Sequence, residues 1–162
     1  EFCCRGPYTL RGYFNAADHN ARAFTADGFY RSGDMMRQHA SGNYMVEGRK
    51  KDLINRGGEK ISAEEVENLI LAHPSVRNVA CVAMPDPVLG EKMCAYAILQ
   101  IGASLDLENL KDFLLSHEIA KFKLPERLEI LDEFPLTTFG KVSKKDLVAM
   151  VSKKIRQEAV NP

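Results

Sequence analysis

Apolar side chains recur at helical spacing in three stretches of the chain. The stretch Ser62–Ala72 places Val66, Leu69 and Ile70 on one face of a predicted helix. Its Ser62 and the glutamate three residues later form a capping box, which indicates where the helix begins. Two further helices are predicted, one after Asp106 and one after Ser143, with these apolar residues turned inward: Leu107, Leu110, Phe113, Leu114, Leu147, Val148 and Val151.

Longer apolar runs predict strands, and Val76–Met84 predicts a buried one because it is rich in β-branched residues. Pro85-Asp86-Pro87 is expected to break this strand. The other strands are expected at Leu53-Ile54, directly after Gly57-Gly58, at Lys92–Gln100 and at Leu128–Leu131. From residue 52 onward the order is two short strands, helix, strand, strand, helix, strand, helix. This order is typical of an α+β fold, a small sheet-and-helix sandwich.

The first 48 residues show strands and loops without a core of their own. Residues 1–14, which mix β-prone residues with Gly6-Pro7 and Gly12, predict a strand that runs into a turn-rich loop, and the alanine-rich Asn15–Phe24 predicts a short helix. Phe29–His39 and Asn43–Glu47 flank Ser41-Gly42 as a predicted hairpin. We therefore expect two domains, residues 1–50 as the strand-rich edge of a larger domain and residues 51–162 as a complete small domain.

Composition narrows the class of protein without naming a function. Hydrophobic residues make up 45% and charged residues 27% of the 162 residues, and 22 basic side chains balance 22 acidic ones. With no net charge, the chain as a whole has no electrostatic attraction for nucleic acid or an anionic membrane surface. No apolar run approaches the ~20 residues that a helix needs to span a bilayer. The start EFCCRGPYTL has neither a signal-peptide pattern nor an initiator Met. We expect a cytoplasmic fragment of a longer protein.

Neither the cysteines nor the histidines show the spacing of a metal site or a catalytic triad. The four cysteines form no CxxC pair and are expected to be reduced. The four histidines are expected to pair with no nucleophile and to lie at the surface or act as caps: His19, His39, His73 and His117. No metal ligand is predicted in this chain.

The segment GRKKDLINRGGEKISAEEVE, residues 48–67, joins a basic run to a glycine doublet and a helix start. Two adjacent glycines permit positive φ and let another backbone or a ligand approach closely. The spacing is not that of a P-loop, which needs GxxxxGK[ST]. Taken alone, the segment is equally well explained by a β-turn between two strands with a solvated basic flank.

Four stretches together resemble the adenylate-forming superfamily of acyl-CoA synthetases, peptide-synthetase adenylation domains and luciferases. They are GPYTLRGYF at 6–14, YRSGD at 30–34, the segment at 48–67 and PLTTFGKVSK at 135–144, in the order and spacing of that family. INRGGEKI and HNARAFTADGFYRSGD look closest to stand-alone aryl-acid ligases such as the 2,3-dihydroxybenzoate–AMP ligases of siderophore synthesis.

The resemblance implies two half-reactions. An aryl acid and ATP give an acyl-adenylate and pyrophosphate, with Mg²⁺ held by residues outside this chain. A phosphopantetheine thiol of a carrier protein, or CoA, then takes the acyl group. The mobile small domain would swing between two poses against the rest of the large domain, about a hinge at Lys51.

The resemblance also assigns roles to single residues. Asp34 would accept hydrogen bonds from the ATP ribose, and Arg49 would contact ribose or phosphate; the alternatives are a turn aspartate and a solvated linker charge. Lys141 would stabilise charge as the carboxylate attacks the α-phosphate, unless it merely precedes a helix.

The thiol-transfer loop is implied in the same way. Gly57 and Gly58 would let the pantetheine arm pass against bare backbone. Lys60 and Arg56 are weaker candidates, which would contact the carrier protein or phosphates, or else be surface charge.

Two readings remain open. The chain is the C-terminal part of an aryl-acid ligase, with the lid domain of an acyl-CoA synthetase as the alternative enzyme. By itself it is also interpretable as a non-catalytic module that docks a carrier protein.

Overall fold

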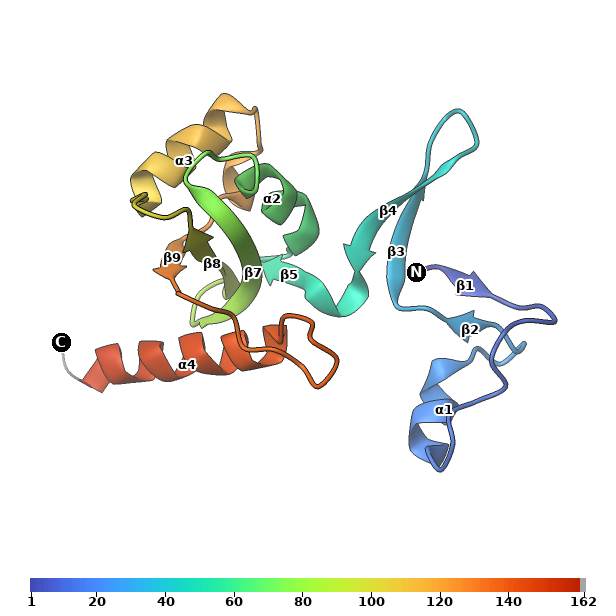
Figure 1. The fold of residues 1–162 in the computed structure, drawn as a ribbon. Coiled ribbons are helices and arrows are strands. Elements are labelled where there is room, and N and C mark those ends of the chain that lie inside the picture. Colours follow the sequence, from blue (N-terminus) through green and yellow to red (C-terminus); the bar gives the residue numbers. More distant parts are fainter. Residues whose placement is uncertain (161–162) are drawn as a thin grey trace. The chain divides into compact units, whose positions relative to one another are not determined.

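The computed structural model describes residues 1–160, which divide into two compact units. Unit 1 is Glu1–Lys51, and unit 2 begins at Asp52 (Figure 1). A short 3₁₀ turn, η1 (Lys50–Asp52), spans the boundary in the sequence. In the described part of the chain, every helix is too short or too polar to cross a bilayer.

Unit 1 consists of short antiparallel strand pairs and one helix. β1 (Cys3–Cys4) pairs with β2 (Tyr30–Arg31), and β3 (Asp34–Gln38) pairs with β4 (Tyr44–Arg49). The predicted helix is present as α1 (Ala17–Ala23), and the predicted hairpin turns between His39 and Asn43.

The strand and the turn-rich loop expected within residues 1–14 are both present, as β1 and the turns and loops that follow from Gly6-Pro7. One expectation for unit 1 was too long. The strand expected over Phe29–His39 is divided into β2 and β3 at Ser32-Gly33. Gly33 has φ +79°, a conformation that turns the chain and that glycine adopts without strain.

Unit 2 contains a five-stranded sheet, so the predicted α+β fold is confirmed. The strands are β5 (Leu53–Arg56), β6 (Glu59–Ser62), β7 (Val76–Asp86), β8 (Gly90–Leu99) and β9 (Arg127–Ile130). Their order is β6-β5-β8-β7, and β9 pairs in parallel with β8 beside β5. The helices are α2 (Ala63–Ile70), α3 (Leu107–Ser116) and α4 (Lys144–Val160), with a 3₁₀ turn η2 (Lys121–Lys123).

Both faces of this sheet are covered, which explains why residues 79–84 of β7 form a continuous apolar run. Val79 and Cys81 pack with α2 and α3, whereas the intervening Ala80 and Val82 pack with α4. Figure 1 shows α2 and α3 on one side of β7 and β8, and α4 on the other. Successive side chains of a strand point to opposite faces, so a strand buried on both sides has no polar alternation.

The three predicted helix caps are confirmed. The Ser62 hydroxyl oxygen accepts a hydrogen bond from Glu65 N at 3.3 Å, and the Asp106 carboxylate accepts one from Asn109 N at 2.8 Å. The Ser143 hydroxyl oxygen accepts a longer one from Asp146 N, 3.4 Å. Each cap satisfies an amide that the first turn of a helix leaves without a partner.

Two local predictions in unit 2 were wrong. β7 continues through Pro85 to Asp86, because β7 is an edge strand and a proline there removes no hydrogen bond to an outer neighbour. Val148 is 36% exposed and not turned inward. The inward stripe of α4 is Leu147, Val151 and Ile155, at four-residue spacing, and Val148 lies about 100° around the helix from Leu147.

Candidate active site

Asp34 and Arg49, the two predicted nucleotide-binding residues, face each other in unit 1. They are register partners at the end of the β3–β4 ladder, and Arg49 Nε lies 3.0 Å from Asp34 Oδ1. The backbone N of Asp34 donates to the Ser32 hydroxyl at 3.0 Å, which fixes the turn before β3. Both side chains keep contact with solvent, with 56% of Arg49 and 32% of Asp34 exposed. A carboxylate acceptor and a guanidinium donor are therefore presented together.

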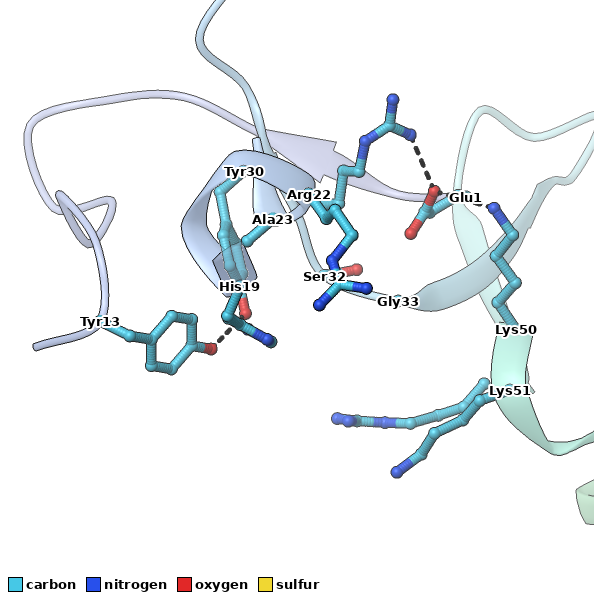
Figure 2. A pocket seen from close by; sticks show the side chains of 12 residues that line it. Glu1, Tyr13, His19, Arg22, Ala23, Tyr30, Ser32, Gly33, Lys50 and Lys51 are labelled. Carbon is cyan, nitrogen blue, oxygen red and sulfur yellow. Dashed lines mark hydrogen bonds and ion pairs between the residues drawn. The ribbon is translucent and has the colours of Figure 1, made fainter. Parts of the chain in front are cut away.

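A cavity opens beside Arg49 and is lined entirely by residues of unit 1 (Figure 2). Its wall is rich in cations: Arg22, Arg31, Arg49, Lys50 and Lys51. The only carboxylate in the lining is Glu1, which contacts Arg31 at 3.1 Å and Lys50 at 3.4 Å. Desolvation opposes the shift, but these two cations lower the pKa of Glu1. The cavity suits an anionic ligand.

Aromatic residues form the other side of the same cavity. The hydroxyl groups of Tyr13 and Tyr30 are hydrogen bonded at 2.9 Å, and the ring of His19 packs edge-on against Tyr13 at 4.7 Å between centroids (Figure 2). Sequence reasoning missed this wall and the basic residues Arg22 and Arg31. Arg31 lies inside the YRSGD run, so the run itself was the available signal.

Lys51, the predicted hinge, is exposed in η1 at the end of unit 1. The residue before it is tied down, since Lys50 N donates to Gly33 O at 2.8 Å. The chain passes from unit 1 to unit 2 directly after Lys51.

Gly57 and Gly58 form the two-residue turn between β5 and β6, with φ of +58° and +99°. Two positive φ values are typical of a tight hairpin turn that favours glycine. A Cβ on Gly57 would lie 3.0 Å from a methyl carbon of Leu89, whereas a Cβ on Gly58 would meet nothing within 4 Å. A side chain at Gly57 would therefore displace the end of the Leu89 side chain, whereas Gly58 leaves open space over bare backbone.

The two basic candidates beside this turn differ. Lys60 is exposed on β6 opposite Asn55. Arg56 is half-buried, and its Nε lies 2.5 Å from a carboxylate oxygen of Glu126. The other oxygen of Glu126 accepts a hydrogen bond from Met93 N at 2.9 Å. Arg56 therefore stabilises the sheet, which makes it a weaker candidate than Lys60 for contact with a partner.

Lys141 lies in a small closed loop between β9 and α4. Thr137 N donates to Lys141 O at 2.7 Å, Lys141 N donates to the Thr137 hydroxyl at 3.2 Å, and Gly140 turns the chain with φ +74°. The Lys141 side chain is exposed, and no carboxylate within residues 1–160 pairs with it. The loop thus holds the backbone and leaves the ammonium available.

The remaining titratable groups are not arranged for catalysis. Burial raises the pKa of the Cys81 thiol, and burial raises that of Cys94 to about 12, so neither is a ready nucleophile. His39 Nδ1 accepts a hydrogen bond from Ser41 N in the β3–β4 turn, and His73 Nδ1 accepts one from Ser75 N after α2. Against expectation, serine hydroxyls lie beside two histidines, Ser41 Oγ 2.9 Å from His39 Nδ1 and Ser116 Oγ 3.2 Å from His117 Nδ1, both within local turns. Across residues 1–160, no three metal-ligating side chains form a cluster.

Comparison with known proteins identifies the relatives of this chain. Residues 65–141 match the family described as AMP-binding enzyme C-terminal domain. A salicylyl-CoA synthase / salicylate adenylyltransferase from a Streptomyces species is 60% identical over 143 residues, which are 88% of this chain and 26% of that protein. The 2,3-dihydroxybenzoate-AMP ligase of Bacillus subtilis is 53% identical over 151 residues, 93% of this chain and 28% of that protein.

A solved structure extends the likeness to the fold. The crystal structure of ATP-bound MatB from Rhodopseudomonas palustris superposes with a TM-score of 0.81 at 30% identity, over 91% of this chain and 29% of that one. The chain therefore spans between 26% and 29% of the length of these relatives.

Proposed function

This chain belongs to the AMP-binding enzymes and carries their C-terminal domain, and from that premise we propose that it is the C-terminal part of an ATP-dependent aryl-acid ligase. The acid is a 2-hydroxybenzoate, with 2,3-dihydroxybenzoate in siderophore synthesis as the first candidate. The observation that carries the proposal is the 53–60% identity to two enzymes whose names specify 2,3-dihydroxybenzoate and salicylate.

The first half-reaction joins the acid to AMP. A carboxylate oxygen attacks the α-phosphorus of ATP, the bond to the bridging oxygen breaks, and pyrophosphate leaves with the electron pair. The approach of two anions favours a fixed cation, the role proposed for Lys141. Mg²⁺, held by residues of the large domain, would accompany the phosphates.

Nucleotide binding is proposed for Asp34 and Arg49. The carboxylate of Asp34 suits the ribose hydroxyls as an acceptor, and the exposed guanidinium of Arg49 suits ribose or phosphate oxygens. The basic wall that continues through Arg22 and Arg31 supports an anionic ligand beside this pair. We assign residues 1–50 to the edge of the large adenylating domain.

The second half-reaction transfers the acyl group to a thiol. The thiolate attacks the acyl carbon, a C–S bond forms, and AMP leaves. We propose that residues 51–162 are the mobile lid, that Lys51 is the hinge, and that the Gly57-Gly58 turn with Lys60 faces the phosphopantetheine arm. The open space over Gly58 supports this assignment. The parent enzyme would act in the cytoplasm.

A second acceptor, CoA, is favoured by the salicylyl-CoA synthase among the relatives. In that case the same turn would face the pantetheine of CoA, as in the lid of an acyl-CoA synthetase. The isolated 162 residues would in either case be a docking module without turnover, because this chain covers only 26% to 30% of the length of three of its relatives.

Pyrophosphate exchange by the full-length parent tests the proposal. With 2,3-dihydroxybenzoate and salicylate, exchange should exceed that with benzoate or 3-hydroxybenzoate by at least about tenfold, because a site that bonds a hydroxyl rejects acids lacking it. Loading of a carrier protein and of CoA should then be compared. Exchange that ignores the 2-hydroxyl, or that needs no aryl acid, would contradict the proposal.

A further inference from the structure

A bridge of three groups joins α2, β7 and the first residue of α4. Lys144 Nζ lies 2.7 Å from Glu67 Oε1. The same oxygen accepts a hydrogen bond from Cys81 N at 2.6 Å. Only 27% of the Lys144 side chain and 16% of the Glu67 side chain are exposed, so the pair is better shielded than an ordinary surface ion pair.

Of the two charged residues in this bridge, Glu67 is explained by its local position and Lys144 is not. β7 is an edge strand, and Glu67 supplies an acceptor on the side where no further strand lies. Lys144, however, begins a helix whose N-terminal end carries partial positive charge, which disfavours a cation there. The carboxylate of Glu67 is what makes a lysine favourable at this position.

Lys144, one member of the bridge, follows Lys141 by only three residues in the sequence. Ser143 N donates to Pro135 O at 2.8 Å, and Thr137 N donates to Lys141 O at 2.7 Å, so the loop is closed on itself directly before α4. Figure 1 shows this loop extending from the N-terminal end of α4. A shift of the first turn of α4 would therefore carry Lys141 with it.

We propose that Glu67 and Lys144 are positioning residues for Lys141, an inference that rests on the adenylating role proposed for Lys141. The ion pair anchors the first turn of α4 to the edge of the sheet and so fixes the point from which the loop projects. Hydrophobic packing of Leu147 and Val151 holds α4 on the sheet, and the Glu67–Lys144 ion pair adds a charged link at the first residue of the helix.

The chain offers a matched control at the other end of the same helix. Lys154 forms an ion pair with Glu129 of β9, with 2.6 Å between Nζ and Oε2. Lys154→Gln thus removes another link between α4 and the sheet, with a more exposed lysine (51%), far along the helix from Lys141. Glu67→Gln keeps an amide oxygen for Cys81 N while removing the charge, and Lys144→Arg keeps the charge.

In the full-length parent, Lys144→Gln and Glu67→Gln should each lower acid-dependent pyrophosphate exchange roughly tenfold, because small displacements of a catalytic group are costly. Transfer from a supplied acyl-adenylate should change less than about twofold, since that step does not use Lys141. Lys154→Gln should leave both steps unchanged, and Lys144→Arg, which keeps the positive charge, should keep pyrophosphate exchange near the level of the unaltered enzyme. Equal losses in Lys144→Gln and Lys154→Gln, or equal losses in both steps, would overturn the proposal.

Amide exchange in the 162-residue chain tests the anchor without any catalysis. The amides of Thr137 and Gly140, bonded inside the loop, should exchange several-fold faster in Lys144→Gln than in Lys154→Gln. If amide exchange is the same in Lys144→Gln as in the unaltered chain, the ion pair does not anchor the loop and the proposal is wrong. If amide exchange becomes faster but Lys141→Ala leaves adenylation intact, the role proposed for Lys141 is wrong, and the positioning role is wrong with it.

Discussion

The two units differ in how much buried apolar packing supports their candidate functional residues. Unit 2 holds two clusters of buried apolar side chains, one on each face of its sheet. In unit 1, Ala23 is the only apolar side chain among the described residues that is buried, at 8% exposure. Large apolar side chains of unit 1 are instead exposed: Phe2, Tyr8, Leu10, Tyr13, Phe14, Tyr44, Met45 and Val46.

The candidate residues of unit 2 are held in place by a hydrophobic core, whereas those of unit 1 are held by the hydrogen bonds between two strands. Lys141 and the Gly57-Gly58 turn project from elements that pack on a core. Asp34 and Arg49 are held by the β3–β4 hydrogen bonds and by each other. An exposed apolar strand pair of this kind is typical of a surface that another part of a protein covers. We expect the remainder of the large domain to provide that cover.

The largest effect should follow from truncating the core of unit 2. Leu114→Ala removes a side chain that is 0% exposed, and a cavity of this kind costs about 2–5 kcal/mol of unfolding free energy. Val46→Ala in β4, at 59% exposure, should change it by less than about 0.5 kcal/mol. Urea unfolding followed by NMR signals of each unit measures both. Comparable losses of unfolding free energy in the two variants would contradict the proposed difference between the two units.

The next effect concerns the two half-reactions in the full-length parent. Lys141→Ala should lower adenylation roughly 10²–10³-fold, the scale for losing one preorganised charge-stabilising group, and should spare transfer from a supplied acyl-adenylate. Gly58→Leu should do the reverse, because its bulk fills the open space over the turn. Pyrophosphate exchange and single-turnover loading of a carrier protein are the two measurements.

Gly58→Ala is the control for backbone strain. Its φ of +99° disfavours any side chain, so alanine carries the strain of the leucine variant without its bulk. Transfer should therefore be slower in the leucine variant than in the alanine variant. If Lys141→Ala and Gly58→Leu impair both half-reactions alike, the assignment of one loop to each step is wrong.

The smallest effect is a local pH dependence in unit 2. A hydrogen bond from Lys92 and backbone N–H groups of Leu89 and Val88 lower the pKa of Asp86 from 3.8 to about 2. Because the pKa is lowered in the folded chain, the stabilisation is complete above pH 3.8 and is lost as the pH falls toward about 2. Asp86→Asn should remove this part of the acid sensitivity.

The measurement is an NMR titration of the Asp86 carboxyl carbon, with unfolding followed over the same pH range. A midpoint near 4 would show that the turn before β8 does not stabilise the charged form. The β3–β4 turn of unit 1 is closed by a backbone bond from His39 N to Asn43 O, 2.7 Å, and should not follow this titration.

Local chemistry was enough to predict much of the fold. Ser62, Asp106 and Ser143 cap helices because their side chains reach the amide three residues ahead. Gly57 and Gly58 turn the chain because only glycine adopts such φ values freely. The resemblance of four short stretches likewise named the candidate residues Asp34, Arg49 and Lys141 before any coordinates.

Tertiary structure decided what depends on neighbours distant in the sequence. Pro85 stays within β7 because that strand lies at an edge, and Val148 faces outward because Leu147 takes the inward position. Glu67, Cys81 and Lys144 come together only when α2, β7 and α4 pack on one sheet. A sequence pattern records spacing along one element, whereas an ion pair and a hydrogen bond that link three elements depend on strand order and on which face each helix covers.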